Sequence, residues 1–98
     1  MTRRDIETAI RSAVTRVPDH TGLLDHAAGP IASRLAETLD RGDHSWETAD
    51  RIVMDACDQA ASTHGIAHTI SPDETANIVD VIDDATGRVG IRLEVSAW

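Results

Sequence analysis

The clearest pattern of apolar and polar positions lies in the middle of the chain, from Ser45 to His64. Apolar residues recur there at the three- and four-residue spacing that places them on one face of an α-helix. Ser45 is a favourable N-cap, and Gly65 can close the helix in a left-handed conformation. The sequence therefore predicts a central helix with a buried face of Trp46, Ala49, Ile52, Val53, Ala56, Cys57, Ala60 and Ala61.

A first helix is predicted at the start of the chain. Thr2 and Asp5 have the spacing of a capping box, with Asp in place of the usual Glu. Pro18 ends the pattern, because proline cannot continue a helix. The predicted buried face consists of Ile6, Ala9, Ile10, Ala13, Val14 and Val17.

A second helix is predicted between a connector and a tight turn. Pro30 suits its first turn, and Gly42 follows its last apolar position. The preceding connector, residues 18–30, is rich in Gly, Pro, Asp and His, and we expect its Leu23 and Leu24 to reach the core. The second and central helices should then be antiparallel neighbours.

After Gly65 the apolar period changes from helical to alternating. Residues 66–70 alternate over a short stretch, and residues 88–98 alternate over their whole length, which is a strand pattern. Residues 72–84 are ambiguous, because Ser71, Pro72 and Glu74 resemble a helix start whereas the β-branched run 78–82 favours a strand. We favour the strand, because the strand predicted for residues 88–98 needs a neighbouring strand to pair with.

These elements predict an α+β fold in one small domain, residues 1–98. In it, an N-terminal three-helix unit (1–65) packs on a β-rich, acidic part (66–98) that forms an antiparallel β-hairpin or a small three-stranded sheet. The alternative is a mostly α fold with four helices and one strand. One cysteine and no apolar span of about 20 residues favour a reducing, cytoplasmic compartment.

Charge narrows the functions that the chain can perform. Seventeen acids and nine Arg give a net charge of −8, which argues against binding nucleic acid or anionic membrane directly. Residues 55–98 hold eight of the acids but only two Arg, so this half is electronegative. We expect a partner-binding acidic face formed by Asp55, Asp58, Asp73, Glu74, Asp80, Asp83 and Asp84.

Two patterns resemble chemical sites but are weak. Cys57, His64 and His68 have a loose zinc-ligand spacing, but a structural zinc site needs four ligands. Three Asp-His dipeptides lie in or beside loops, where Asp and His are ordinary turn formers, and no nucleophile motif accompanies them. The sequence therefore predicts no enzyme, metal or cofactor. The three dipeptides are Asp19-His20, Asp25-His26 and Asp43-His44, and an enzyme would lose activity when their histidines are changed.

The function expected from these features is a non-catalytic acidic interaction module. Its partner would be a protein with a basic nucleic-acid-binding surface, as in small phage inhibitors that act by nucleic-acid mimicry on a defence or regulatory complex. The alternatives are a winged-helix-like DNA-binding regulator or antitoxin, and a small assembly domain with merely solubilising charge. The sequence also predicts contacts for a homodimer at Ile91, Leu93, Val95 and Trp98.

Overall fold

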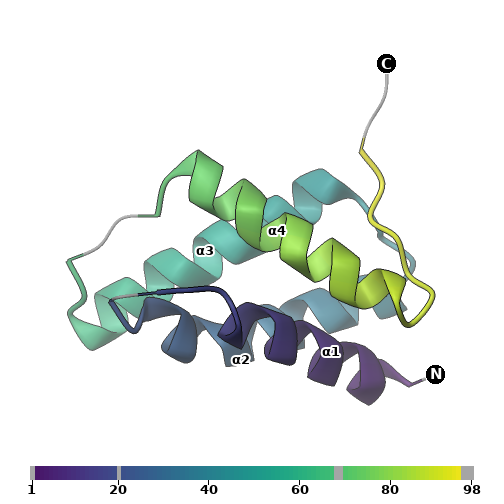
Figure 1. Ribbon diagram of the computed structural model, residues 1–98, viewed down its shortest axis with the longest axis horizontal. Coiled ribbons are helices and arrows are strands. Elements are labelled where there is room, and N and C mark those ends of the chain that lie inside the picture. The colour runs from purple at the N-terminus through teal and green to yellow at the C-terminus, as the bar shows by residue number, and fades with distance from the viewer. Residues whose placement is uncertain (1, 20, 68–69, 96–98) are drawn as a thin grey trace.

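The computed structural model describes residues 2–19, 21–67 and 70–95. The described residues form four helices: α1 (Arg3–Thr15), α2 (Leu23–Asp40), α3 (Trp46–His64) and α4 (Pro72–Gly87). Helices α1 and α4 form one layer, and α2 and α3 form the layer behind them (Figure 1). Each helix packs on two others, α1 and α3 both contacting α2 and α4, so the apolar core lies between the two layers.

The predicted α+β fold is wrong. Over the described residues there is no strand or sheet, and the segment predicted as the first strand of a hairpin is α4. The segment 66–70 is not a strand where it is described, and residues 68 and 69 lie outside the described part. The mostly α alternative is confirmed in its four helices, whereas its one strand is reduced to a single bridge between Ser45 and Glu94.

Helix α4 forms because its start signal outweighs the strand preference of its β-branched residues. The backbone N–H of Glu74 donates to Ser71 Oγ at 3.1 Å, and the Ser71 N–H donates to Glu74 Oε1 at 3.3 Å, which completes a capping box. Ile78, Val79 and Ile82 then fall on one buried face. Strand propensity depends on context, and here the capping box and burial on a helical face together favour the helix.

Helix α2 begins earlier than the sequence predicts. It starts at Leu23 rather than near Pro30, which lies inside it. Asp19 explains the early start, because its Oδ2 accepts a 2.6 Å hydrogen bond from the Leu24 N–H and so satisfies a backbone donor of the first turn. Leu23 and Leu24 are buried as predicted.

Helices α1 and α3 confirm the sequence predictions. Thr2 and Asp5 form the capping box that opens α1. Ser45 caps α3, and Gly65 ends it with a φ of 65° in the left-handed region. Of the predicted buried face of α3, five residues are buried, namely Ala49, Val53, Ala56, Cys57 and Ala60, and the other three are half-buried against the core, namely Trp46, Ile52 and Ala61.

The segment that follows α4 is tied to the α2–α3 turn. The Glu94 N–H donates to the His44 carbonyl oxygen, and the Trp46 N–H donates to the Glu94 carbonyl oxygen, both at 2.7 Å. Leu93 is buried in the core beside this bridge. No helix within the described residues is both long and apolar enough to cross a membrane.

Candidate interaction surface

The residues with zinc-ligand spacing are not brought together where the structure describes them. Cys57 is fully buried on α3, whereas His64 is exposed at the end of that helix, and His68 lies outside the described residues. Within the described ranges, no group of three or more His, Cys, Asp or Glu side chains is placed to hold a metal ion. Burial raises the pKa of the Cys57 thiol to about 11, with further contributions from the negative charges of Asp58, Asp19 and Glu74.

The Asp-His dipeptides make hydrogen bonds with backbone groups of loops and helix ends. Asp19 accepts backbone hydrogen bonds at the start of α2, and Asp43 Oδ1 accepts one of 3.1 Å from the Ser45 N–H. His44 Nε2 lies 3.2 Å from the Leu39 carbonyl oxygen. His20 lies outside the described residues. These contacts give the described side chains local structural roles.

The dipeptide Asp25-His26 contributes a contact that the sequence does not suggest. The ring of His26 on α2 stacks on the ring of His64 on α3, with centroids 3.7 Å apart and an angle of 14° between the planes. Imidazole nitrogens bind a metal in the plane of the ring, and two nearly parallel planes at this separation do not converge on one ion. The stack therefore joins the two helices without forming a chelate, and the neighbouring Asp25 is exposed in the first turn of α2.

Three of the predicted partner-binding acids form a single row on α4. Asp73, Asp80 and Asp84 are exposed, and their separations of seven and four residues correspond to whole helical turns. We call these three residues the α4 acidic stripe. Asp84 forms an exposed ion pair with Arg88 at 3.1 Å, whereas Asp80 has no hydrogen-bond or ion-pair partner within the described part of the chain.

The other four predicted acids have different positions. Asp83 is largely buried and accepts the Leu93 N–H at 2.8 Å, so its role is structural. Glu74 belongs to the capping box of α4 and lies beside a cavity. Asp55 and Asp58 are exposed on α3, outside the α4 acidic stripe.

The residues predicted to form a homodimer contact are divided between core and surface. Leu93 is buried and Ile91 is half-buried against the core, so both are used within the molecule. Val95 is 66% exposed, and Trp98 lies outside the described residues. The homodimer stays a prediction, with Val95 as its exposed apolar residue in the described chain.

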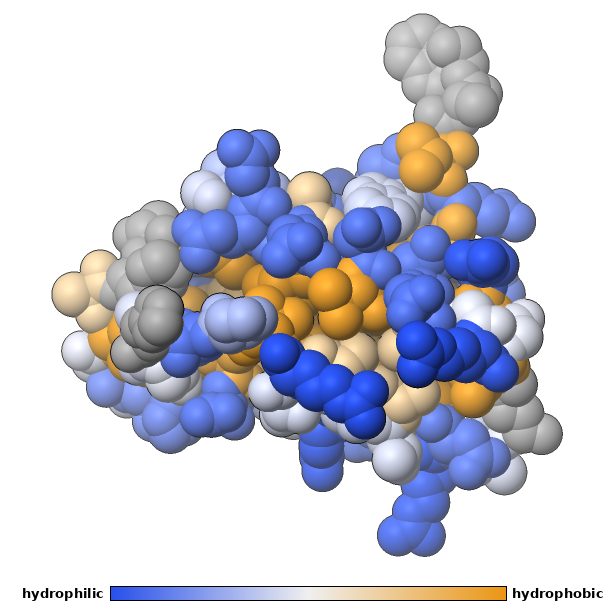
Figure 2. Space-filling model, viewed as in Figure 1, coloured by the Kyte–Doolittle hydropathy of each residue, from blue (hydrophilic) through white to orange (hydrophobic). Residues whose placement is uncertain are grey.

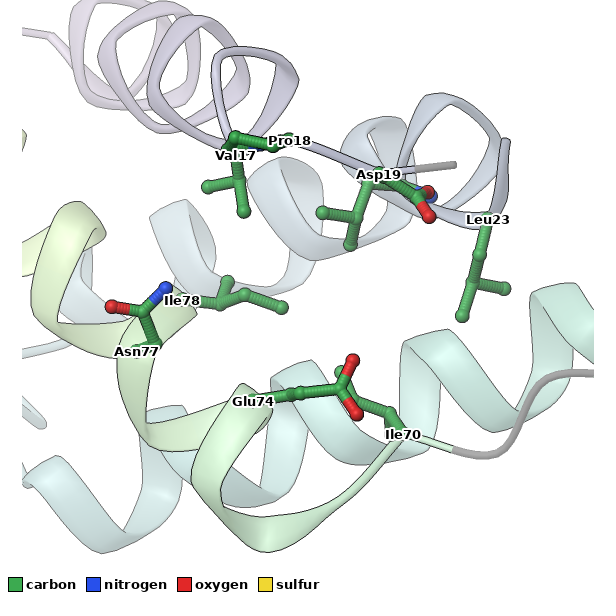
Figure 3. A pocket seen from close by; sticks show the side chains of 9 residues that line it. Val17, Pro18, Asp19, Leu23, Ile70, Glu74, Asn77 and Ile78 are labelled. Atoms are coloured by element: carbon green, nitrogen blue, oxygen red, sulfur yellow. The ribbon is translucent and has the colours of Figure 1, made fainter. Parts of the chain in front are cut away.

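A cavity of about 110 Å³ lies between the α1–α2 connector and the start of α4. Figure 3 shows the apolar side chains of Val17, Leu23 and Ile78 directed toward it, with the carboxylates of Asp19 and Glu74 on different sides. The remaining lining residues are Pro18, Leu24, Ile70 and Asn77. The cavity therefore combines apolar walls with two acidic groups.

The face that carries α1 and α4 is the one seen in Figure 2. An apolar strip is visible between the two helices, and hydrophilic side chains border it on both sides. The outer side of α4 is covered by hydrophilic side chains in the same view. This face thus offers both a polar border and a partly apolar centre.

Comparison with known proteins gives no relative for this chain. No family model matches it, and neither a curated protein nor a solved structure matches it.

The acids of α4 were predicted from the sequence, but their arrangement on the helix was not. The signal was present, because Asp73, Asn77, Asp80 and Asp84 have the spacing of one helical face once residues 72–87 are taken as a helix. The cavity had no such signal. Its lining comes from residues 17–24 and 70–78, and only the packing of the helices brings them together.

Proposed function

We propose that this chain is a non-catalytic interaction domain that binds a basic protein surface through the α4 acidic stripe. The observation that supports the proposal is the row of three exposed carboxylates on one helix. A helix holds such charges at fixed separations, so a complementary row of cations can meet them with little loss of backbone freedom. A cytoplasmic location is part of the proposal, because the one cysteine is a buried free thiol.

The narrower form of the proposal is that the domain blocks a nucleic-acid-binding site. The α4 acidic stripe places three carboxylates over about 16 Å, whereas one strand of DNA carries about five phosphates over that length. More acids must therefore join the stripe if the domain imitates DNA closely. Asp55 and Asp58 on α3 are the candidates, because both are exposed and α3 packs against α4.

The other two functions expected from the sequence have less support. A winged helix needs a β-hairpin, which the described residues do not form. A domain with merely solubilising charge needs no ordered row of acids, and its binding to cations should depend on net charge alone. This difference gives a direct test.

The test compares two double variants that change the net charge by the same amount. Asp73→Arg with Asp80→Arg reverses two of the three charges of the α4 acidic stripe, and Asp25→Arg with Asp40→Arg reverses two exposed acids of α2. Asp73 and Asp25 each lie in the first turn of their helix. An arginine at either position opposes the helix dipole, so both double variants carry this cost. Affinity for a decalysine peptide is measured by calorimetry at low and at physiological salt.

We expect the stripe variant to bind decalysine about tenfold more weakly than the parent, and the α2 variant to stay within about threefold. Equal losses in both variants would favour the solubilising role and contradict a localised surface. For the narrower form, the parent domain should displace a DNA duplex from a lysine-rich linker histone, and the stripe variant should not.

A further inference from the structure

The two arginines of the C-terminal half lie at the end of α4, beside its acids. Residues 55–98 contain no other arginine and no lysine. Arg88 Nη2 donates to Asp84 Oδ2 at 3.1 Å, and Arg92 Nη1 lies 3.8 Å from Asp83 Oδ2. Both arginines of this half are therefore paired with acids near the C-terminal end of α4.

The position of Arg92 follows from the tight turn after α4 (Figure 1). The Ile91 N–H donates to the Thr86 carbonyl oxygen at 2.9 Å, and Gly90 has a φ of 88° in the left-handed region that favours glycine. The Arg92 guanidinium consequently lies against Gly87, the last residue of α4, where an added Cβ would be 3.3 Å from it. The turn thus returns a cation to the helix that the chain has just left.

The C-terminal end of α4 is also the place where its backbone favours a cation. The last carbonyl groups of a helix have no partner within the helix, and they carry the negative end of its dipole. The last turn of α4 contains no basic residue, so Arg88 and Arg92 supply positive charge from beyond it. A cation of a partner protein would be attracted to the same end.

We propose that Arg88 competes with the basic partner for Asp84, so that the α4 acidic stripe is partly occupied in the free protein. The inference rests on the proposed function and adds a regulatory contact to that surface. The side chains of Asp73 and Asp80 have no hydrogen-bond or ion-pair partner among the described residues, so a partner reaches them directly. At Asp84 the partner first has to displace Arg88.

The competing contact is built to be displaced. Both side chains of the pair between Arg88 and Asp84 are 72% exposed, and exposed pairs four residues apart on a helix contribute little to stability. The Arg88 side chain can therefore leave without unfolding the helix. A single cation gains nothing over Arg88, whereas a partner with several cations also contacts Asp73 and Asp80 and displaces it. The contact thus selects partners with a row of positive charges.

The test compares two arginines in matched positions. Arg88 and Arg41 are the C-cap residues of α4 and α2, and each forms an exposed ion pair with the acid four residues before it. Arg88→Gln and Arg41→Gln change the net charge equally. We expect Arg88→Gln to bind decalysine about threefold more tightly than the parent at low salt, and Arg41→Gln to stay within about 1.5-fold. Equal gains, or no gain in Arg88→Gln, would overturn the inference.

Two further variants test whether the gain depends on Asp84. In an Asp84→Asn background Arg88 has no carboxylate to occupy, so Arg88→Gln should add no more than Arg41→Gln does. Arg88→Lys keeps a cation within reach of Asp84 and should bind decalysine as the parent does. A gain that persists with Asp84→Asn, or an Arg88→Lys variant that binds as tightly as Arg88→Gln, would contradict competition at this carboxylate.

The same titrations separate the inference from the proposed function. If Asp73→Arg with Asp80→Arg weakens decalysine binding but Arg88→Gln behaves like Arg41→Gln, the surface is correct and the internal competition is wrong. If Arg88→Gln strengthens binding through Asp84 while that double variant loses no more than the α2 variant, the competition stands. Decalysine then binds only the end of α4, and the proposed function of the whole stripe fails.

Discussion

The backbone N–H of Leu93 donates a 2.8 Å hydrogen bond to Oδ1 of Asp83. This contact fixes the segment after α4 against the helix, and Leu93 occupies the core as a result. Asp83 was expected from the sequence to belong to the acidic partner surface. Its carboxylate is directed instead to the molecule's own backbone, so it must be kept intact in any experiment on that surface.

The Asp83 contact predicts a difference between neighbouring acids. Asp83→Ala leaves a partly buried backbone N–H without its partner, and we expect a loss of about 1–3 kcal/mol in the free energy of unfolding. Asp80→Ala, on the exposed side of the same helix, should change stability by less than about 0.5 kcal/mol. Urea denaturation of both variants checks this, and equal effects would show that the contact does not hold the segment.

The capping box of α4 predicts a second effect. Ser71→Ala removes the acceptor for the Glu74 N–H and should destabilise the protein by about 1 kcal/mol. Glu74→Gln should keep the bond from the Ser71 N–H, because the amide oxygen can still accept it, so we expect a smaller loss than in Ser71→Ala. Thermal unfolding followed by circular dichroism measures both. A neutral Ser71→Ala variant would mean that burial alone determines α4.

The position of Pro30 predicts a stabilising change. Proline inside α2 lacks the N–H that would bond to the carbonyl of the preceding turn, and Pro30 is exposed, so no core packing depends on its ring. We expect Pro30→Ala to raise the free energy of unfolding by about 1–2 kcal/mol, after allowing for the greater freedom of alanine in the unfolded chain. Chemical denaturation measures the change, and a loss of stability would contradict a regular helix at this position.

The buried thiol predicts how stability depends on pH. The pKa of Cys57 is raised from its ordinary value of 9.0 to about 11 by burial and by nearby negative charge. Between these values the unfolded chain loses the thiol proton while the folded chain keeps it, so stability should fall by about 2 kcal/mol as pH rises through this window. The chain contains neither Lys nor Tyr, so no other side chain ordinarily titrates there.

Denaturant titrations across that pH range measure the fall in stability. In the Cys57→Ala variant, this part of the fall should be absent. Native Cys57 should also react slowly with a thiol reagent at pH 8, since the thiolate is the reactive form and the side chain is fully buried. Fast labelling without denaturant would contradict the burial of Cys57.

The sequence predicted helices best where their ends carry local signals. Ser45 and Gly65 bound α3, and Thr2 with Asp5 opens α1, as expected. The start of α2 was missed because its first-turn donor is satisfied by Asp19, several residues before the helix. Helix α4 was missed because its β-branched residues were given more weight than the capping box at Ser71.

The candidate surface was predictable in composition but not in geometry. The acids of α4 are evident from the sequence, whereas their alignment depends on helical rather than strand periodicity. The different role of Asp83 depends on Leu93, ten residues away, which approaches it only after the chain has turned back along α4. Val17 and Ile78 line the same cavity only because the helices pack together, and the sequence has no local signal for that packing.

The contacts among the four helices determine when the domain can finish folding during its synthesis. Helix α4 packs on both α1 and α3, so each of these two helices lacks one of its two neighbours until α4 has been made. A chain emerging from the ribosome exposes apolar faces of α1 and α3 during that interval, and such surfaces are recognised by chaperones. Folding of this domain is therefore completed only after synthesis has passed α4 and the segment that carries Leu93.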